Sequence, residues 1–154
     1  MSRTLVTDRP FDAAQTDLLR ILSGLIIPAS EDYEVPGADD DTIFAEVLRQ
    51  ATSHAGTLKP LLATLSDQAQ TNLGGAFEQL SSTQQAELLG RSGNAPLLKH
   101  MISLIAVAYY QDGRVLASLN LKSTPPFPNG HDVDQGDWSL LDPVRQREPF
   151  YKKP

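Results

Sequence analysis

The sequence predicts an all-α protein, in which a compact helical domain of about five helices precedes an extended C-terminal arm. Apolar residues recur with a helical period from Ala13 onward, and no stretch before the arm alternates as a strand does. From Ser123 the helical period disappears, and this last segment holds more than half of the chain's 11 prolines. The helical domain is therefore expected at residues 1–122 and the arm at residues 123–154.

The most apolar segment, from Pro96 to Gln111, predicts the central core helix. Its apolar residues form two adjacent stripes, with Leu97, Met101, Leu104 and Ala108 on one and Leu98, Ile102, Ile105 and Tyr109 on the other. Two adjacent stripes indicate a helix that is enclosed on most sides. The apolar run is shorter than the roughly 20 residues that span a bilayer, so no membrane span is expected.

A first helix is predicted from Ala13 to Ile27. Asp12 can cap its N-terminus with Gln15 as the reciprocal partner, and Pro28 ends it. The apolar stripe of this helix consists of Leu18, Ile21, Leu22, Leu25 and Ile26.

An acidic loop follows, from Pro28 to Asp41. Three consecutive aspartates, Asp39, Asp40 and Asp41, lie where the N-terminus of the next helix favours negative charge. That second helix is predicted from Thr42 to about Thr52, with an inward face of Ile43, Phe44, Val47, Leu48 and Ala51.

A third helix is predicted to begin near Leu58, with Pro60 in its first turn, where a missing N–H is tolerated. The pair Gly74-Gly75 breaks or bends it. A short fourth helix is predicted before Gly90, because Ser82 and Gln85 have the spacing of a capping box.

Two further helix boundaries follow from polar residues around the central helix. Asn94 is expected to cap the central helix at its N-terminus. A last short helix is predicted from Arg114 to Leu119.

Composition excludes several classes of function. The formal net charge is -6, which makes a nucleic acid or an anionic membrane an unsuitable partner. The chain contains no cysteine, so disulfides, thiol catalysis and thiolate metal sites are excluded. Residues Met1 to Asp12 contain neither an apolar signal region nor a twin-arginine pair, so we expect no export signal and a cytoplasmic location.

The arm carries the residues that we predict to bind a partner. Disordered tails are poor in aromatic residues, but this arm holds several, so we expect it to pack on the domain or on a partner. Trp138 is its predicted anchor, and packing on the chain's own domain is the interpretation that we favour. Arg145 and Arg147 either pair with acidic groups on a partner or form an internal salt bridge with the loop from Glu31 to Glu34. The predicted partner-binding residues are Phe127, Trp138, Leu140, Leu141, Arg145 and Arg147.

Several segments resemble the gluconate 2-dehydrogenase subunit 3 family. The C-terminal part carries Y-Y-Q-D-G-R-V-L-A-S-L from Tyr109, P-P-F-P-N-G from Pro125 and G-D-W-S-L-L-D-P-V-R from Gly136. The segment L-L-R-I-L-S-G-L-I-I-P-A-S-E-D from Leu18, with V-P-G-A-D after it, is similar to the family's opening segment. The stretch F-E-Q-L-S-S-T-Q-Q-A-E-L-L from Phe77 is similar to its middle.

This resemblance implies a small, non-catalytic, mostly helical accessory subunit. Its partner would be the large subunit of a flavin-dependent dehydrogenase of the glucose-methanol-choline type, which oxidises alcohols, sugars or sugar acids, and a cytochrome subunit can accompany it. FAD is expected on that partner and no cofactor on this chain. Many members of the family carry a twin-arginine signal and escort the large subunit through export. This chain departs from the family there, so its location would be periplasmic only through export with a partner or after loss of a signal.

No nucleophile–base pair, glycine-rich phosphate loop or complete metal-binding motif stands out, so the chain is not expected to be an enzyme. His100 has no second ligand at helical spacing, and His54 is interpreted as a favourable charge near a helix C-terminus. The loop His131 to Asp137 has alternating carboxylates but lacks the later glutamate of an EF-hand, so an Asp-rich turn is favoured over a calcium site. A free-standing binding or metal-sensing module that uses this loop is the alternative function.

Overall fold

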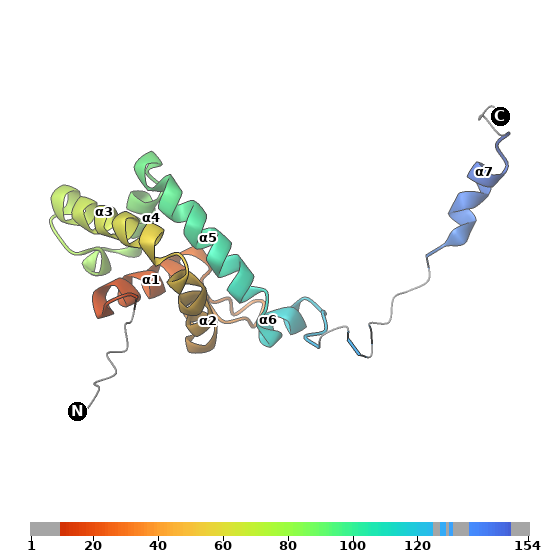
Figure 1. The fold of residues 1–154 in the computed structure, drawn as a ribbon, viewed down its shortest axis with the longest axis horizontal. Coiled ribbons are helices and arrows are strands. Elements are labelled where there is room, and N and C mark those ends of the chain that lie inside the picture. Colours follow the sequence, from red (N-terminus) through yellow and green to blue (C-terminus); the bar gives the residue numbers. More distant parts are fainter. Residues whose placement is uncertain (1–9, 125–126, 129, 131–135, 149–154) are drawn as a thin grey trace, which may run out of the picture. The chain divides into compact units, whose positions relative to one another are not determined.

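The computed structural model describes residues 10–124, 127–128, 130 and 136–148. It confirms the all-α fold, because the described residues form seven α-helices and no strand. Their β-type pairing is limited to an isolated bridge between Ser30 and Val35. The chain divides into two units, residues 1–123 and residues 124–154, and each is described here by itself (Figure 1).

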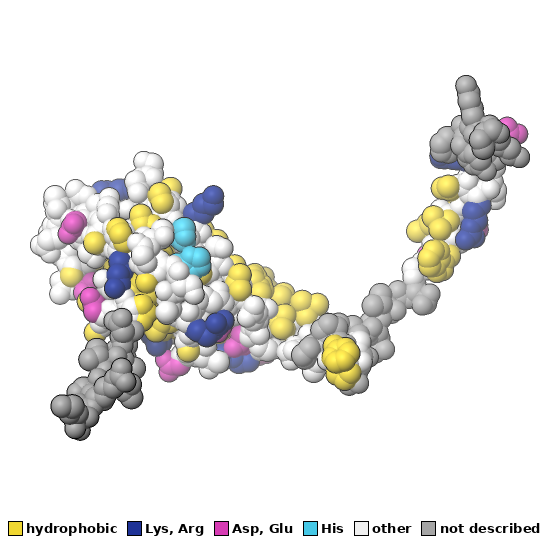
Figure 2. All heavy atoms as spheres, in the orientation of Figure 1, with side chains coloured by type: hydrophobic (Ala, Val, Ile, Leu, Met, Phe, Trp, Pro, Cys, Tyr) yellow, Lys and Arg dark blue, Asp and Glu magenta, His cyan; other side chains and the backbone are white. Residues whose placement is uncertain are grey.

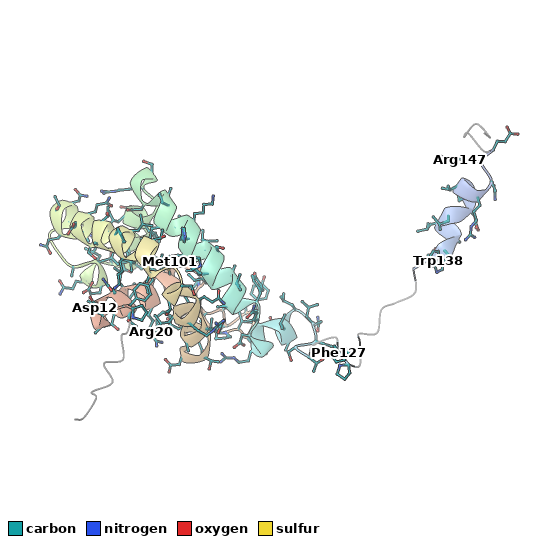
Figure 3. All side chains as sticks on the ribbon, in the orientation of Figure 1. Asp12, Arg20, Met101, Phe127, Trp138 and Arg147 are labelled. Atoms are coloured by element: carbon teal, nitrogen blue, oxygen red, sulfur yellow. The ribbon has the colours of Figure 1, made fainter. Side chains whose placement is uncertain are left out.

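The helical unit is organised around α5 (Ala95–Tyr109), which packs against α1, α2 and α3 (Figure 1). Its residues at helical spacing that face these partners are buried: Leu97, Met101, Leu104, Ile105, Ala108 and Tyr109. Met101 is fully buried and lies among these helices (Figure 3). Burial of each such large side chain contributes roughly 1.5–3 kcal/mol before conformational entropy is subtracted.

Helix α1 (Ala13–Ile26) begins with the predicted capping box. The Gln15 N–H donates to Asp12 Oδ1 at 2.8 Å, and the Asp12 N–H donates to Gln15 Oε1 at 3.2 Å. Leu18, Leu19 and Leu22 then point into the core.

The loop between α1 and α2 (Asp41–Thr52) folds tightly against the end of α1. The Ala38 N–H donates to the Ile27 carbonyl at 2.9 Å. Gly37 is required at this crossing, because a Cβ there would lie 2.9 Å from the Ala29 backbone nitrogen. The predicted aspartate cap is correct in kind: Asp40 is the N-cap, and its Oδ1 accepts from the Thr42 N–H at 3.1 Å.

Helix α3 (Ala55–Leu73) begins three residues before the predicted start near Leu58. Pro60 therefore lies inside the helix rather than in its first turn. The proline ring removes the N–H that would bond to the Gly56 carbonyl, and the exposure of Gly56 lets water satisfy that carbonyl. The predicted break at Gly74 is correct, since Gly74 adopts a left-handed conformation with φ of 73°.

A short 3-10 turn, η1 (Phe77–Gln79), leads to α4 (Ser82–Leu89). The capping box predicted at Ser82 and Gln85 is wrong by one residue, because Ser81 and Gln84 form it. Gln85 instead turns inward, and its Nε2 donates to the buried Phe77 carbonyl at 2.9 Å. In the helix that starts after Ser81, Leu88 and Leu89 are buried on the same side as Gln85.

Asn94 ends the 3-10 turn η2 (Ser92–Asn94) and precedes α5, but its side chain does not cap that helix as predicted. The side chain is buried and turns the other way, so that its Nδ2 donates to Gln68 Oε1 and to the Leu88 carbonyl, each at 2.7 Å. The amide therefore joins α3 to the end of α4. It bonds there rather than capping α5, because an unsatisfied buried amide is more costly than an uncapped helix end that water can reach.

Helix α6 (Gly113–Ser118) ends the helical unit in a Schellman motif. The Leu121 N–H donates to the Leu116 carbonyl at 2.9 Å, and the Asn120 N–H donates to the Ala117 carbonyl at 3.0 Å, with Asn120 at φ of 57°.

The second unit contains η3 (Trp138–Leu141) and the single-turn helix α7 (Asp142–Arg145). The arm is therefore not wholly extended as predicted. Asp137 starts the turn by accepting from the Ser139 N–H at 3.0 Å, and this local bond needs no helical period in the sequence.

Candidate functional site

Two arginines hold the acidic loop. Arg114 forms a bidentate pair with Asp40, with Nη2 2.7 Å from Oδ1 and Nη1 3.2 Å from Oδ2. The same guanidinium contacts Asp112, the N-cap of α6, with Nε 3.0 Å from Oδ1. Hydrogen bonds to Arg114 hold the pKa values of both carboxyl groups below their usual range. Arg114 thus links the N-terminus of α2 to that of α6.

Arg20 holds the other side of this loop. Its Nη1 donates to the Asp39 carbonyl at 2.7 Å and to Asp41 Oδ1 at 2.8 Å. The guanidinium carbon lies 4.3 Å from the centroid of the Phe44 ring, within cation–π range. These contacts explain the aspartate run as a structural feature, and they show which cations pair with it: Arg20 and Arg114, from α1 and α6.

A tyrosine pair marks the end of α5. Tyr109 is buried, and its hydroxyl donates to the Pro36 carbonyl at 3.0 Å. Tyr110 turns outward, with 55% of its surface exposed, and its ring meets that of Tyr109 edge-on with centroids 5.5 Å apart. Tyr110, Tyr33 and Leu119 line one open pocket of about 330 Å³.

Two further apolar side chains of α5 are exposed. Ile102 and Val107 are each 47% exposed. The prediction of a helix enclosed on most sides therefore holds for the stripe that contains Met101 and fails at Ile102 in the other stripe. Among the described residues of the helical unit no helix covers Ile102, although Ile105 and Tyr109 from the same stripe are buried. Figure 2 shows hydrophobic side chains gathered toward the α6 end of the helical unit.

Large apolar side chains are exposed on the loop before α2, on α5 and around the end of α6. We call this set the α5–α6 surface, and its residues are Tyr33, Ile102, Val107, Tyr110, Leu119 and Leu121. From position 102 to position 110 the exposed residues are Ile102, Ser103, Val107 and Tyr110, and none of them is charged. The sequence prediction missed this surface because it assigned Ile102 to the core and made no prediction for Val107 and Tyr110. Only tertiary packing determines which apolar residues of the helix are covered.

His54 and His100 lie together, which the sequence does not reveal. His54 is the residue before α3, and His100 is on the second turn of α5. Their ring centroids are 5.8 Å apart, with the ring planes at 69°. In Figure 2 the histidine side chains, in cyan, lie next to each other on the helical unit. His54 lies after the C-terminus of α2, as predicted, but it is also at the N-terminus of α3, so the interpretation as a helix-dipole charge describes only half of its surroundings.

The predicted partner-binding residues are all in the second unit, where Phe127, Trp138 and Arg147 are labelled in Figure 3. Trp138 is 64% exposed within that unit, and Phe127, Leu140 and Leu141 are exposed as well. Arg145 Nη1 lies 3.3 Å from Asp142 Oδ1, so its internal partner is the start of its own turn. Pairing of Arg145 or Arg147 with the loop from Glu31 to Glu34 stays a prediction. In the loop His131 to Asp137, residues 131–135 lie outside the described residues.

Within the described ranges, no three or more His, Asp or Glu side chains come together as a metal site. No helix in that part of the chain is long and apolar enough to cross a membrane, in agreement with the expectation of no membrane span.

Comparison with known proteins adds no assignment. The chain matches no protein-family model, no curated protein and no solved structure. The resemblance to the gluconate 2-dehydrogenase subunit 3 family therefore stays a prediction from the motifs of the sequence.

Proposed function

We propose that this chain is a small, non-catalytic accessory subunit that binds and stabilises a flavin-dependent dehydrogenase or helps it to mature. The observation that carries this proposal is the α5–α6 surface. Monomeric domains rarely leave a row of large apolar side chains in water, and such patches on stable domains are typical of protein–protein interfaces. The arm residues Trp138, Leu140 and Leu141 add a second apolar set, exposed within its own unit.

The kind of partner rests on the resemblance described above. One of the resembling motifs, Y-Y-Q-D-G-R-V-L-A-S-L, runs from Tyr109 to Leu119, and this segment contributes Tyr110 and Leu119 to the α5–α6 surface. Sequence resemblance and exposed apolar area thus fall on the same segment. In this proposal the large subunit carries the FAD and oxidises an alcohol, a sugar or a sugar acid, and a cytochrome subunit completes some of the complexes.

Co-purification tests the proposal directly. The full-length chain, tagged and expressed in its native host, is expected to bring down a large subunit whose eluate shows flavin absorbance. The double variant Tyr110→Asp with Leu119→Asp places two charges on the α5–α6 surface and is expected to abolish that recovery, because burying unpaired charges at an interface is costly.

The matched control is Thr71→Asp, which places a charge on the exposed side of α3. It is expected to leave the recovery unchanged. Equal recovery of the flavoprotein by the double variant and by the control would assign binding to another surface. An eluate without any flavoprotein would refute the accessory-subunit function itself.

A further inference from the structure

The two neighbouring histidines come from parts of the chain that are 46 positions apart, and the fold supplies to His100 the second imidazole that its own helix lacks. His54 comes from the junction between α2 and α3, which both pack against α5. His54 is exposed and His100 is half-buried, and both line a shallow pocket of about 360 Å³ together with Pro96, Lys99, Ser103 and Leu104.

We propose that His54 and His100 form a two-histidine site for a divalent transition-metal cation of the zinc class. This proposal is independent of the accessory-subunit function. It also differs from a calcium loop in the arm, because the ligands are imidazoles from the helical unit.

The spacing of the two rings fits a shared metal ion. A zinc ion binds an imidazole nitrogen at about 2.0–2.1 Å, which places it roughly 3.2 Å from the ring centroid. Two rings that share one ion therefore have centroids at most about 6.4 Å apart, and about 5.2 Å apart at a tetrahedral angle. The observed separation of 5.8 Å lies between these values.

The chemistry of the pocket selects the class of metal. None of the six described residues that line it carries a carboxylate, the ligand that Ca²⁺ and Mg²⁺ require. Imidazole nitrogen suits Zn²⁺, Ni²⁺ and Cu²⁺ instead. Two protein ligands leave positions on the ion for water, or for the Ser103 hydroxyl, which lines the same pocket. The Lys99 ammonium opposes the cation, so it lowers the affinity of the site.

Titration of the full-length chain with ZnCl₂, followed by calorimetry and by the NMR signals of the histidine rings, tests the site. The wild-type chain is expected to bind one Zn²⁺ with shifts of two histidine rings. His54→Ala and His100→Ala are each expected to weaken binding at least tenfold. Lys99→Met is expected to tighten it, and CaCl₂ is expected to give no binding heat.

The matched control is His131→Ala, which removes the third histidine of the chain. It is expected to bind Zn²⁺ as the wild type does. Because His54 is exposed, His54→Ala is expected to keep the wild-type melting temperature, so its loss of binding cannot be attributed to unfolding. Absence of Zn²⁺ binding by the wild type, unchanged binding in both His54→Ala and His100→Ala, or loss only in His131→Ala would overturn the proposal.

Discussion

Removal of a single group, the hydroxyl of Tyr109, tests how α5 is fixed to the loop before α2. The chain provides its own control, because Tyr110 has the same side chain next in sequence but faces water. Tyr109→Phe removes a 3.0 Å hydrogen bond to the Pro36 carbonyl and leaves the buried ring in place. Tyr110→Phe removes a hydroxyl that is hydrated in the folded and in the unfolded state.

A neutral hydrogen bond of this kind contributes roughly 0.5–1.5 kcal/mol to stability. Pro36 is half-buried, so water can reach its carbonyl in the variant and limit the penalty. We therefore expect Tyr109→Phe to lower the free energy of unfolding by about 1 kcal/mol, and to lower Tm by about 3–5 °C. Urea unfolding monitored by circular dichroism measures the first quantity, and a thermal scan measures the second.

The pH dependence gives the same variant a second readout. Burial, with smaller contributions from Tyr110 and Asp112, raises the pKa of Tyr109 above its ordinary value of 10.0. The folded state therefore favours the protonated phenol, and its contribution to stability is fully present below pH 10 and is lost as the pH rises through the raised pKa. The wild-type advantage over Tyr109→Phe is expected to shrink above pH 10. Equal stability of the wild type and Tyr109→Phe at pH 7, or an equal loss in Tyr110→Phe, would refute this reasoning.

Three further predictions concern other parts of the chain. Asn94→Ala is expected to cost about 1–2 kcal/mol by urea unfolding, because it removes the 2.7 Å hydrogen bond to the buried Leu88 carbonyl, although the Arg91 N–H still donates to that oxygen at 3.3 Å. A loss below about 0.5 kcal/mol would contradict the buried-amide interpretation. Hydrogen bonds from Arg49 and Gln50 lower the pKa of Glu46 to about 2, so the stability that this carboxylate contributes is present above pH 4.5 and is lost as the pH falls toward 2. Glu46→Gln is expected to flatten that part of the acid unfolding profile, and an unchanged profile would count against it. Trp138→Ala is expected to lower stability by about 3–5 kcal/mol if the arm packs on its own domain; an unchanged Tm with a partner affinity weaker by at least about 2 kcal/mol would assign Trp138 to the interface instead.

Local signals in the sequence predicted the fold best where a side chain bonds to its own backbone and no buried group competes for it. The capping box of Asp12 and Gln15 is such a case, since both partners lie within one turn of each other. The box at α4 was placed one residue late because Ser81 and Ser82 offer the same chemistry at adjacent positions. Only the burial of Gln85 and Leu88 distinguishes the two registers, and burial is a property of the tertiary structure.

Features that join distant segments could not be predicted in this way. Arg114 pairs with Asp40, 74 positions away, and Asn94 bonds to Gln68, 26 positions away. The closeness of His54 to His100 has the same origin, because it depends on how the α2–α3 junction packs against α5. The exposure of part of α5 was also hidden, since an apolar stripe predicts burial whether or not a partner element exists in the same chain.

Helix α6 is the last helix of the helical unit, and its length depends on whether its few contacts hold. A six-residue helix is far too short to persist alone, so α6 depends on the buried Val115, on its Schellman motif and on the Arg114 pairs. As a helix, the six residues span about 9 Å, and as an extended chain they reach about 20 Å. Local opening of α6 would therefore release up to about 11 Å of additional chain length at this end of the helical unit. Since the Arg114 pairs are partly exposed and are screened by salt, α6 is expected to open more readily at high ionic strength.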